Sequence, residues 1–334
     1  MIRDTSPKRR FLRAFFGGKP GRMPVGNVVS IATLELQHTA ATFFPYAHTK
    51  ASEMATLASA GHWHLHYDTV APVFSVVQEV AALGAEVDWG GPTMMPSARA
   101  HPFSGTDRFA FPARWIEAQP ITVVLEAIRI LRRHLGDRVV IVGKVMGPWS
   151  LSYHMMGTEE FLISTLADPD RARRSLDALK GVTIAFAKAQ MQAGADVICL
   201  ADHATGGMVS PLMYRDMLLP LHKEIIAEAA CPMVLHCCGN TDDRIAYFAE
   251  AGFDAYHFES QVNLERAVEM CRGRMALIGN INNPSVLLNG TEEDVRAACL
   301  RAIDAGVDIL APECAVPLTT PTRNLKILAE AAVA

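Results

Sequence analysis

The sequence lacks several features that would place it in a large class at once. No apolar run in its 334 residues is long enough to span a bilayer. The first residues also lack the apolar stretch and the small-residue cleavage site of a signal peptide. We therefore expect a cytoplasmic protein without a membrane partner.

A basic excess is absent too, since the formal net charge is -4. A nucleic-acid-binding protein normally gathers basic residues on one face, so no nucleic-acid partner is expected. The one short basic cluster, Lys8-Arg9-Arg10 with Arg13, is interpreted as a solvated helix face.

No disulfide framework is discernible. The chain is long and has seven cysteines, an odd number. In a reducing compartment, cysteines that gather near a histidine indicate metal binding or nucleophilic chemistry. Four of the seven are interpreted as core or helix residues: Cys199, Cys231, Cys271 and Cys299.

The glycine fingerprint of a dinucleotide-binding fold is also missing, which argues against a doubly wound open sheet. From residue 139 onward, short apolar runs alternate with stretches of helical spacing. The runs are 139–145, 197–200, 233–235, 255–258, 275–278 and 308–310. The helical stretches are 170–192, 211–229, 242–251, 263–272, 292–305 and 321–333. This pattern is typical of parallel strands buried on both faces.

Two earlier apolar runs, 25–29 and 65–67, raise the number of expected strands to eight. Eight strands with intervening helices predict an α/β protein, a (β/α)8 TIM barrel with an N-terminal extension, in which residues 1–334 form a single domain. Residues 84–118 interrupt the alternation with Gly90-Gly91-Pro92 and further prolines. We interpret them as an inserted β-containing excursion at the barrel mouth.

Catalytic groups of such barrels lie where the strands end. The expected strand ends carry a series of polar residues: Tyr153 and His154, Asp202 and His203, His236 to Asn240, His257 and Glu259, Asn280 and Asn282, and Glu313 and Cys314.

Three of these residues form a candidate metal site. His236 and Cys238 are two apart in an extended segment, so their side chains point to one side while Cys237 points away. Cys314 arrives from the last strand. One imidazole and two thiolates would make a tetrahedral zinc site with an open position, which Glu259 could fill when substrate is absent. Spacing alone leaves a hydrogen-bonded histidine near buried cysteines as an equal alternative.

Two further groups remain ambiguous. Asp202 either binds substrate or caps the helix expected at Ser210-Pro211. His62, His64 and His66 alternate along an expected strand, and we favour cavity-lining or structural roles over a second metal cluster.

Several motifs resemble those of the uroporphyrinogen decarboxylase superfamily, and within it the methylcobalamin:coenzyme M methyltransferase branch. The most diagnostic are His236-Cys237-Cys238-Gly239-Asn240, Gly279-Asn280-Ile281 and Cys314-Ala315-Val316-Pro317. The resemblance runs nearly the full length. It implies a barrel whose zinc is held by the matching residues, here His236, Cys238 and Cys314.

Members of this branch bind a thiol such as coenzyme M on zinc, and the thiolate takes a methyl group from a methyl-Co(III) corrinoid, usually carried by a separate protein. The decarboxylases instead grip porphyrinogen carboxylates with an arginine-rich N-terminal segment. The matching residues 24–30 read Pro-Val-Gly-Asn-Val-Val-Ser, without arginine. Decarboxylation is therefore not expected.

The expected function is zinc-dependent transfer of a methyl group from methylcobalamin or a corrinoid protein to a small thiol. Two thiolate ligands neutralise the zinc charge, so a third, bound thiolate stays nucleophilic. Glu259 and Asp202 are the expected catalytic residues. The expected substrate-binding residues are Asn240, Asn280, His154 and Tyr153.

Three alternatives remain. The enzyme could demethylate a methoxy-aromatic compound or a methylamine and load cobalt, although that direction is associated with carboxylate-rich zinc sites. The acceptor could be homocysteine or a folate. A corrinoid-binding barrel subunit without catalysis would instead predict a zinc site closed by four protein ligands.

Overall fold

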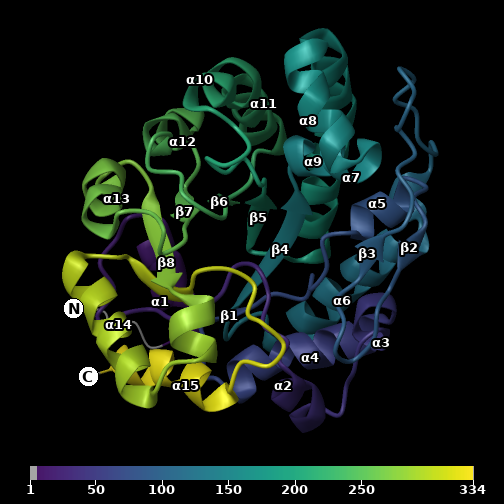
Figure 1. Ribbon diagram of the computed structural model, residues 1–334. Helices are drawn as coiled ribbons and strands as arrows, with labels where there is room; N and C mark the ends of the chain where they lie inside the picture. Colours follow the sequence, from purple (N-terminus) through teal and green to yellow (C-terminus); the bar gives the residue numbers. More distant parts are fainter. Residues whose placement is uncertain (1–5, 334) are drawn as a thin grey trace.

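A computed structural model of the chain describes residues 6–333. Seven parallel strands form one curled sheet in the order β1-β4-β5-β6-β7-β8-β9 (Figure 1). They are β1 (Thr69–Val70), β4 (Val140–Met146), β5 (Val197–Ala201), β6 (Met233–His236), β7 (Ala255–His257), β8 (Ala276–Ile281) and β9 (Ile309–Pro312). Almost all of their residues are buried, as expected for strands packed on both faces.

The segment around Val25 closes this sheet into a barrel. Val25 forms a parallel bridge with Leu310 of β9, and its carbonyl accepts the Asp68 N–H at 2.7 Å, next to β1. The predicted (β/α)8 barrel is confirmed. The expected strand at 25–29 shortens to this bridge because a side chain replaces the backbone ladder: the Asn27 N–H donates to Thr69 Oγ1 at 2.9 Å.

The expected strand at 65–67 is wrong. Helix α4 (Ala51–Trp63) occupies the preceding residues, and the strand begins only at Thr69. His66 has a φ of 60°, a left-handed conformation that an extended strand cannot contain. His62, His64 and His66 therefore do not alternate along a strand. The His62 ring lies at α4, with Nδ1 3.1 Å from the Tyr67 carbonyl oxygen.

Helices cover the outside of the sheet. Those that follow the strands are α6 (Gln119–Leu135), α7 (Pro148–Met156), α8 (Thr158–Ala167), α9 (Pro169–Ala193), α10 (Pro211–Met213), α11 (Leu219–Ala229), α12 (Ile245–Ala251), α13 (Leu264–Cys271), α14 (Glu292–Ala305) and α15 (Thr322–Ala331). Shorter π-helical turns are η2 (Tyr214–Leu218) and η3 (Asn283–Leu288). The helical stretch expected at 292–305 is α14, and Thr291 and Asp294 form a capping box at its start.

The N-terminal extension closes the far end of the barrel. Helix α1 (Pro7–Phe15) inserts Phe11 and Phe15 among the interior residues of the strands. Arg10 is only 8% exposed, and its Nε donates to Asp68 Oδ2 at 2.9 Å. The prediction of a solvated basic face is therefore wrong for Arg10, because the helix buries this face against the barrel.

The excursion contains the predicted β-structure. Strands β2 (Val87–Asp88) and β3 (Ser97–Ala98) pair antiparallel, and a 3-10 turn, η1 (Trp115–Glu117), precedes α6. The Phe103 N–H donates to the Met155 carbonyl at 2.8 Å, so the excursion packs beside α7 at the carboxyl-terminal side of β4 (Figure 1). Three further helices, α2 (Leu34–Thr39), α3 (Tyr46–Thr49) and α5 (Gln78–Ala82), lie in the N-terminal third of the chain. No helix within residues 6–333 is long and apolar enough to cross a membrane.

Candidate metal centre

The sheet register brings two histidines together at the barrel mouth. Ala201 of β5 pairs with His236 of β6, which pairs with His257 of β7. His236 is the last residue of its strand. The chain then turns through Gly239, which has a φ of 77°, and a Cβ at that position would lie 2.2 Å from Thr205 Oγ1. Glycine therefore allows the tight turn that directs Cys238 back toward His236.

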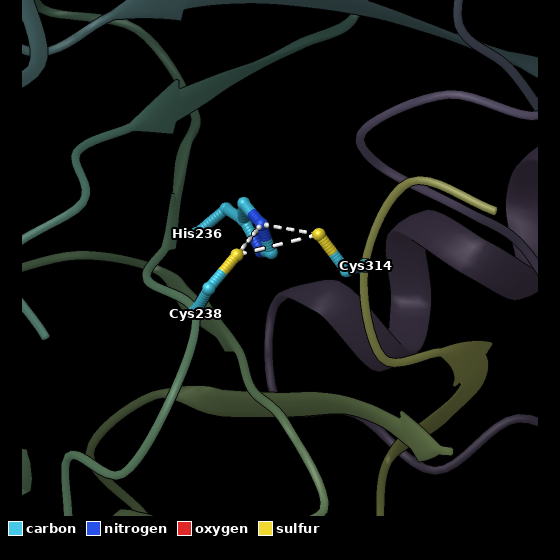
Figure 2. Close-up of side chains that lie close together, drawn as sticks. All are labelled: His236, Cys238 and Cys314. Atoms are coloured by element: carbon cyan, nitrogen blue, oxygen red, sulfur yellow. Dashed lines mark hydrogen bonds between the residues drawn. The ribbon is translucent and has the colours of Figure 1, made fainter. Parts of the chain in front are cut away.

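Cys314 completes a cluster with these two residues, two positions after β9 ends (Figure 2). Cys238 Sγ lies 3.0 Å from His236 Nε2 and 3.3 Å from Cys314 Sγ. Cys314 Sγ lies 3.4 Å from His236 Nε2. The three donor atoms lie within 4.8 Å of one another. The Cys237 side chain is buried and is not part of this cluster.

The pKa values of the two thiols are shifted in opposite directions. A hydrogen bond from Cys238 and the nearby His236 lower the pKa of Cys314. The same pairing, together with burial, raises the pKa of Cys238. The pairing thus shifts the pKa values of the two thiols in opposite directions, down at Cys314 and up at Cys238.

The donor set fits zinc. A tetrahedral zinc ion with bonds of about 2.0–2.3 Å holds its ligand atoms roughly 3.5–3.8 Å apart. The three atoms here are slightly closer because they are hydrogen-bonded to each other, so a small outward movement admits the ion. Two sulfurs and one imidazole nitrogen are ligands that zinc prefers.

Glu259 lies beside this cluster, after the end of β7. Burial raises the pKa of its carboxyl, and the Gly239 N–H, which hydrogen-bonds to it, opposes the shift. The charges of Glu313 and Cys314 raise the pKa of Glu259 further, while a hydrogen bond with the Cys238 thiol lowers it. The carboxyl group is thus next to Cys238 but outside the three-atom cluster.

His257 and Glu313 lie next to the cluster and hold its surroundings in place. The His257 ring lies 4.7 Å from the His236 ring between centroids, and its Nε2 donates to the Pro312 carbonyl at 2.8 Å. Burial and the neighbouring His236 lower the pKa of His257 to about 3, so the ring is neutral. The Glu313 carboxylate accepts the Ser260 N–H at 2.9 Å and the Asn283 N–H at 2.8 Å, which ties three loops together beside Cys314.

Asp202 belongs to a buried network behind the mouth. Its Oδ1 accepts the Ser150 N–H at 2.8 Å, and its Oδ2 lies 2.9 Å from His222 Nε2. His222 Nδ1 lies 2.7 Å from the Tyr214 hydroxyl. The interpretation of Asp202 as a helix cap is wrong, because Ser210 caps that helix with its own hydroxyl.

The four expected substrate-binding residues differ in their burial and in their contacts. The Tyr153 hydroxyl donates to Ser150 Oγ at 3.2 Å, and the charge of Cys238 adds to the burial that raises the pKa of Tyr153. Burial lowers the pKa of His154 to about 4, with His101 and His203 adding to the effect. Asn280 lies two residues beyond Ile278, an interior residue of β8. Asn240 is exposed.

His203 was placed at a strand end from the sequence without being given a role, and Lys144 was missed. The His203 N–H donates to Ser150 Oγ at 2.8 Å, and after burial the largest influence lowering the pKa of His203 is His236. Its place next to Asp202 at a strand end was an available signal. Lys144 is buried in the middle of β4, and a lysine inside an otherwise apolar strand was a stronger signal.

These features define a (β/α)8 barrel with a candidate histidine–dicysteine metal centre at the carboxyl ends of its strands. Residues 6–334 match the model of the uroporphyrinogen decarboxylase (URO-D) family, and the chain belongs to that family. The family resemblance seen in the sequence is confirmed.

Proteins similar to the chain over nearly its full length include several methyltransferases. The chain is 31% identical over 327 residues to the methylcobamide:CoM methyltransferase MtaA of Methanosarcina barkeri, covering 97% of this chain and 96% of that protein. It is 29% identical over 327 residues to a methylated-thiol–coenzyme M methyltransferase of Methanosarcina mazei, covering 98% and 89%. A solved structure of a methyltransferase from Methanosarcina mazei matches with a TM-score of 0.94 at 31% identity, covering 98% of each chain.

Proposed function

We propose that this chain is a zinc methyltransferase that moves a methyl group from a methyl-Co(III) corrinoid to a small thiol such as coenzyme M. The carrying observation is the convergence of His236, Cys238 and Cys314 within 4.8 Å. The similarity to proteins named methylcobamide:CoM methyltransferases supports the same reaction.

The three residues would hold zinc and leave one position for the substrate sulfur. Zinc bound there would lower the pKa of the thiol, so that the thiol is present as a thiolate near neutral pH. Because Cys238 and Cys314 are anionic ligands, they offset the charge of the ion and leave the substrate sulfur electron-rich. Neutral His257, packed on His236, and Glu313, which holds the loop before Cys314, keep the ligands in place.

Glu259 is positioned for two tasks. Its carboxylate would occupy the fourth position of a bound zinc ion when no thiol is present, and it would receive the S–H proton when the thiol replaces it. The raised pKa of this carboxyl suits proton uptake. The sulfur would then attack the methyl carbon of the corrinoid substrate, so that the S–C bond forms, the Co–C bond breaks, and its electron pair remains on cobalt as Co(I).

A corrinoid protein would dock on the rim around the mouth. The excursion and α7–α8 form this rim on one side (Figure 1). It exposes apolar side chains, among them Met94 at 53% and Leu166 at 77%. Exposed methionine and leucine at such a rim are suited to a protein partner.

The test is to incubate the zinc-loaded protein with methylcobalamin and a panel of thiols, and to follow the corrinoid spectrum together with the S-methylated product. We expect thiol-dependent demethylation of methylcobalamin, lost in His236→Ala. Failure with every thiol, together with demethylation of an aromatic methyl ether or a methylamine, would reverse the direction. Methyl transfer to neither would leave a binding subunit and overturn the proposal.

A further inference from the structure

One charged side chain lies within the barrel wall and has no role in the mechanism above. Strands β1 and β4–β9 contain a single Asp, Glu, Lys or Arg, which is Lys144. It lies on the same side of β4 as Val140 and Val142, whose side chains fill the barrel interior. It also pairs in register with Cys199, another interior residue. The side chain therefore points into the barrel, and the residue is only 4% exposed.

The Lys144 ammonium forms no close ion pair with the residues that the structure describes. Within residues 6–333, no carboxylate oxygen lies within 4.0 Å of Nζ, and no hydrogen bond of this group is formed. The nearby Glu79 instead accepts the Met146 N–H at 2.8 Å. Burial lowers the pKa of Lys144, whereas Cys199, Glu79 and Cys314 raise it. A buried cation without a paired anion is costly, and such a group is a candidate for a functional site.

The ammonium faces the same region as the metal cluster. Its charge interacts with Cys314, and Lys144 lies one inward-facing row beneath the row of Met146, Ala201 and His236. A second polar group nearby also lacks a partner. His48 is fully buried with neither ring nitrogen hydrogen-bonded, and after burial the Lys144 charge is what lowers its pKa, to about 3. A buried imidazole without a hydrogen-bond partner thus lies within the electrostatic influence of the Lys144 ammonium.

We propose that Lys144 binds the anionic end group of the substrate, a sulfonate or carboxylate joined to the thiol by a short linker. The placement of the substrate sulfur at the metal cluster rests on the proposed function, whereas the binding of an anion by Lys144 does not. Neighbouring strands are about 4.8 Å apart, so β4 and β6 are separated by roughly 10 Å, which a lysine side chain and a two-carbon thiol together span. With its acid group on Lys144 and its sulfur at His236, Cys238 and Cys314, the thiol is held at two points. The enzyme then selects acidic thiols over neutral or cationic ones.

The experiment compares wild type with Lys144→Met by calorimetric titration. Lys223→Met is the matched control, since it removes an exposed lysine paired only with Glu250. The zinc-loaded proteins are titrated with coenzyme M, 2-mercaptoethanol and cysteamine. Wild type and Lys223→Met should bind coenzyme M at least about tenfold more tightly than 2-mercaptoethanol, as a hydrogen bond to a charged group provides. Lys144→Met should lose this difference while its affinity for 2-mercaptoethanol stays within about threefold.

A second titration separates this inference from the proposed function. Ethanesulfonate, which has no thiol, is titrated into the metal-free proteins, and we expect binding that Lys144→Met loses. Such binding without any thiol methylation would keep the anion site and reject the methyltransferase. Thiol methylation with equal affinities for coenzyme M and 2-mercaptoethanol would reject the anion site alone.

The thermal midpoint of Lys144→Met separates recognition from a structural role. Methionine removes a buried charge at similar volume, so the midpoint should be unchanged or higher. A clearly lower midpoint with equal loss of affinity for all three thiols would show that Lys144 serves the fold, which would overturn the inference.

Discussion

The sulfur of Cys314 lies 3.3 Å from the sulfur of Cys238, although 76 residues separate them in the chain. The two loops meet because parallel strands of a barrel all end at the same rim. At this distance the thiols form a hydrogen bond, which lowers the pKa of Cys314 before any metal arrives. The pair is therefore prepared to bind a soft cation together with His236.

Zinc content tests this site directly. Cys314→Ala removes one of three ligands, so the purified variant should contain little zinc, whereas wild type should contain about one ion per chain. Cys231→Ala is the control, since Cys231 lies outside the cluster. Metal analysis of the three proteins gives the answer. A metal-free wild type, or a Cys314→Ala protein that keeps its zinc, would contradict the assignment.

Alkylation tests the thiolate in the metal-free protein. The pKa of Cys314 is lowered by Cys238 and His236, so Cys314 stays a thiolate as the pH falls from 8 to 6. Iodoacetamide should therefore modify it at a nearly constant rate, whereas an ordinary thiol slows about tenfold for each pH unit. Mass spectrometry after timed quenching measures the rate at each cysteine.

The alkylation experiment has an internal reference. Burial raises the pKa of Cys271 to about 12, so its rate should be low and should follow the ordinary pH dependence. Added zinc should protect Cys314. A Cys314 rate that fell in step with that of an ordinary thiol would show that the pair does not hold a thiolate.

The sequence predicted the parts of the fold in which every residue of a strand is buried. Strands β4 to β9 read as apolar runs because helices cover them outside and the core fills the inside. The two N-terminal strands could not be located in this way. Near Asn27 a threonine side chain takes the place of a ladder bond, and at His66 the backbone turns left-handed. Neither feature can be recognised from the pattern of apolar residues in the sequence.

The candidate site was predictable to a similar extent. His236, Cys238 and Cys314 follow from strand order and spacing, with the family resemblance supplying the metal. The surroundings of Asp202 could not be predicted from strand order and spacing. Its partner His222 lies 20 residues later on α11 and contacts it only because this helix packs against the barrel. The direction of the Lys144 side chain depends on the register of β4, and because the other residues of this strand are apolar on both faces, the sequence does not show which face is the barrel interior.

The buried network around Asp202 makes a prediction about stability. Asp202→Ala leaves the Ser150 N–H and His222 without their acceptor, so the free energy of unfolding should fall by about 2–4 kcal/mol. Tyr214→Phe removes only a hydroxyl at the edge of the network and should cost about 1 kcal/mol. Urea unfolding measures both, with exposed Asp216→Ala as control. If Asp202→Ala were as stable as wild type but inactive, the result would instead support a catalytic role for Asp202.

Glu259 gives the sharpest test of the fourth zinc position. If its carboxylate occupies that position only when no thiol is bound, Glu259→Gln should weaken zinc binding about 10- to 100-fold without thiol. With saturating coenzyme M the variant and wild type should bind zinc equally, because the thiol then supplies the fourth ligand in both. Competition against a chromogenic chelator, with and without the thiol, measures the four affinities. Glu265→Gln, on the exposed side of α13, is the matched control. An equal loss of zinc affinity under both conditions would show that Glu259 acts on the ligands throughout, and no loss in either would remove it from the zinc site.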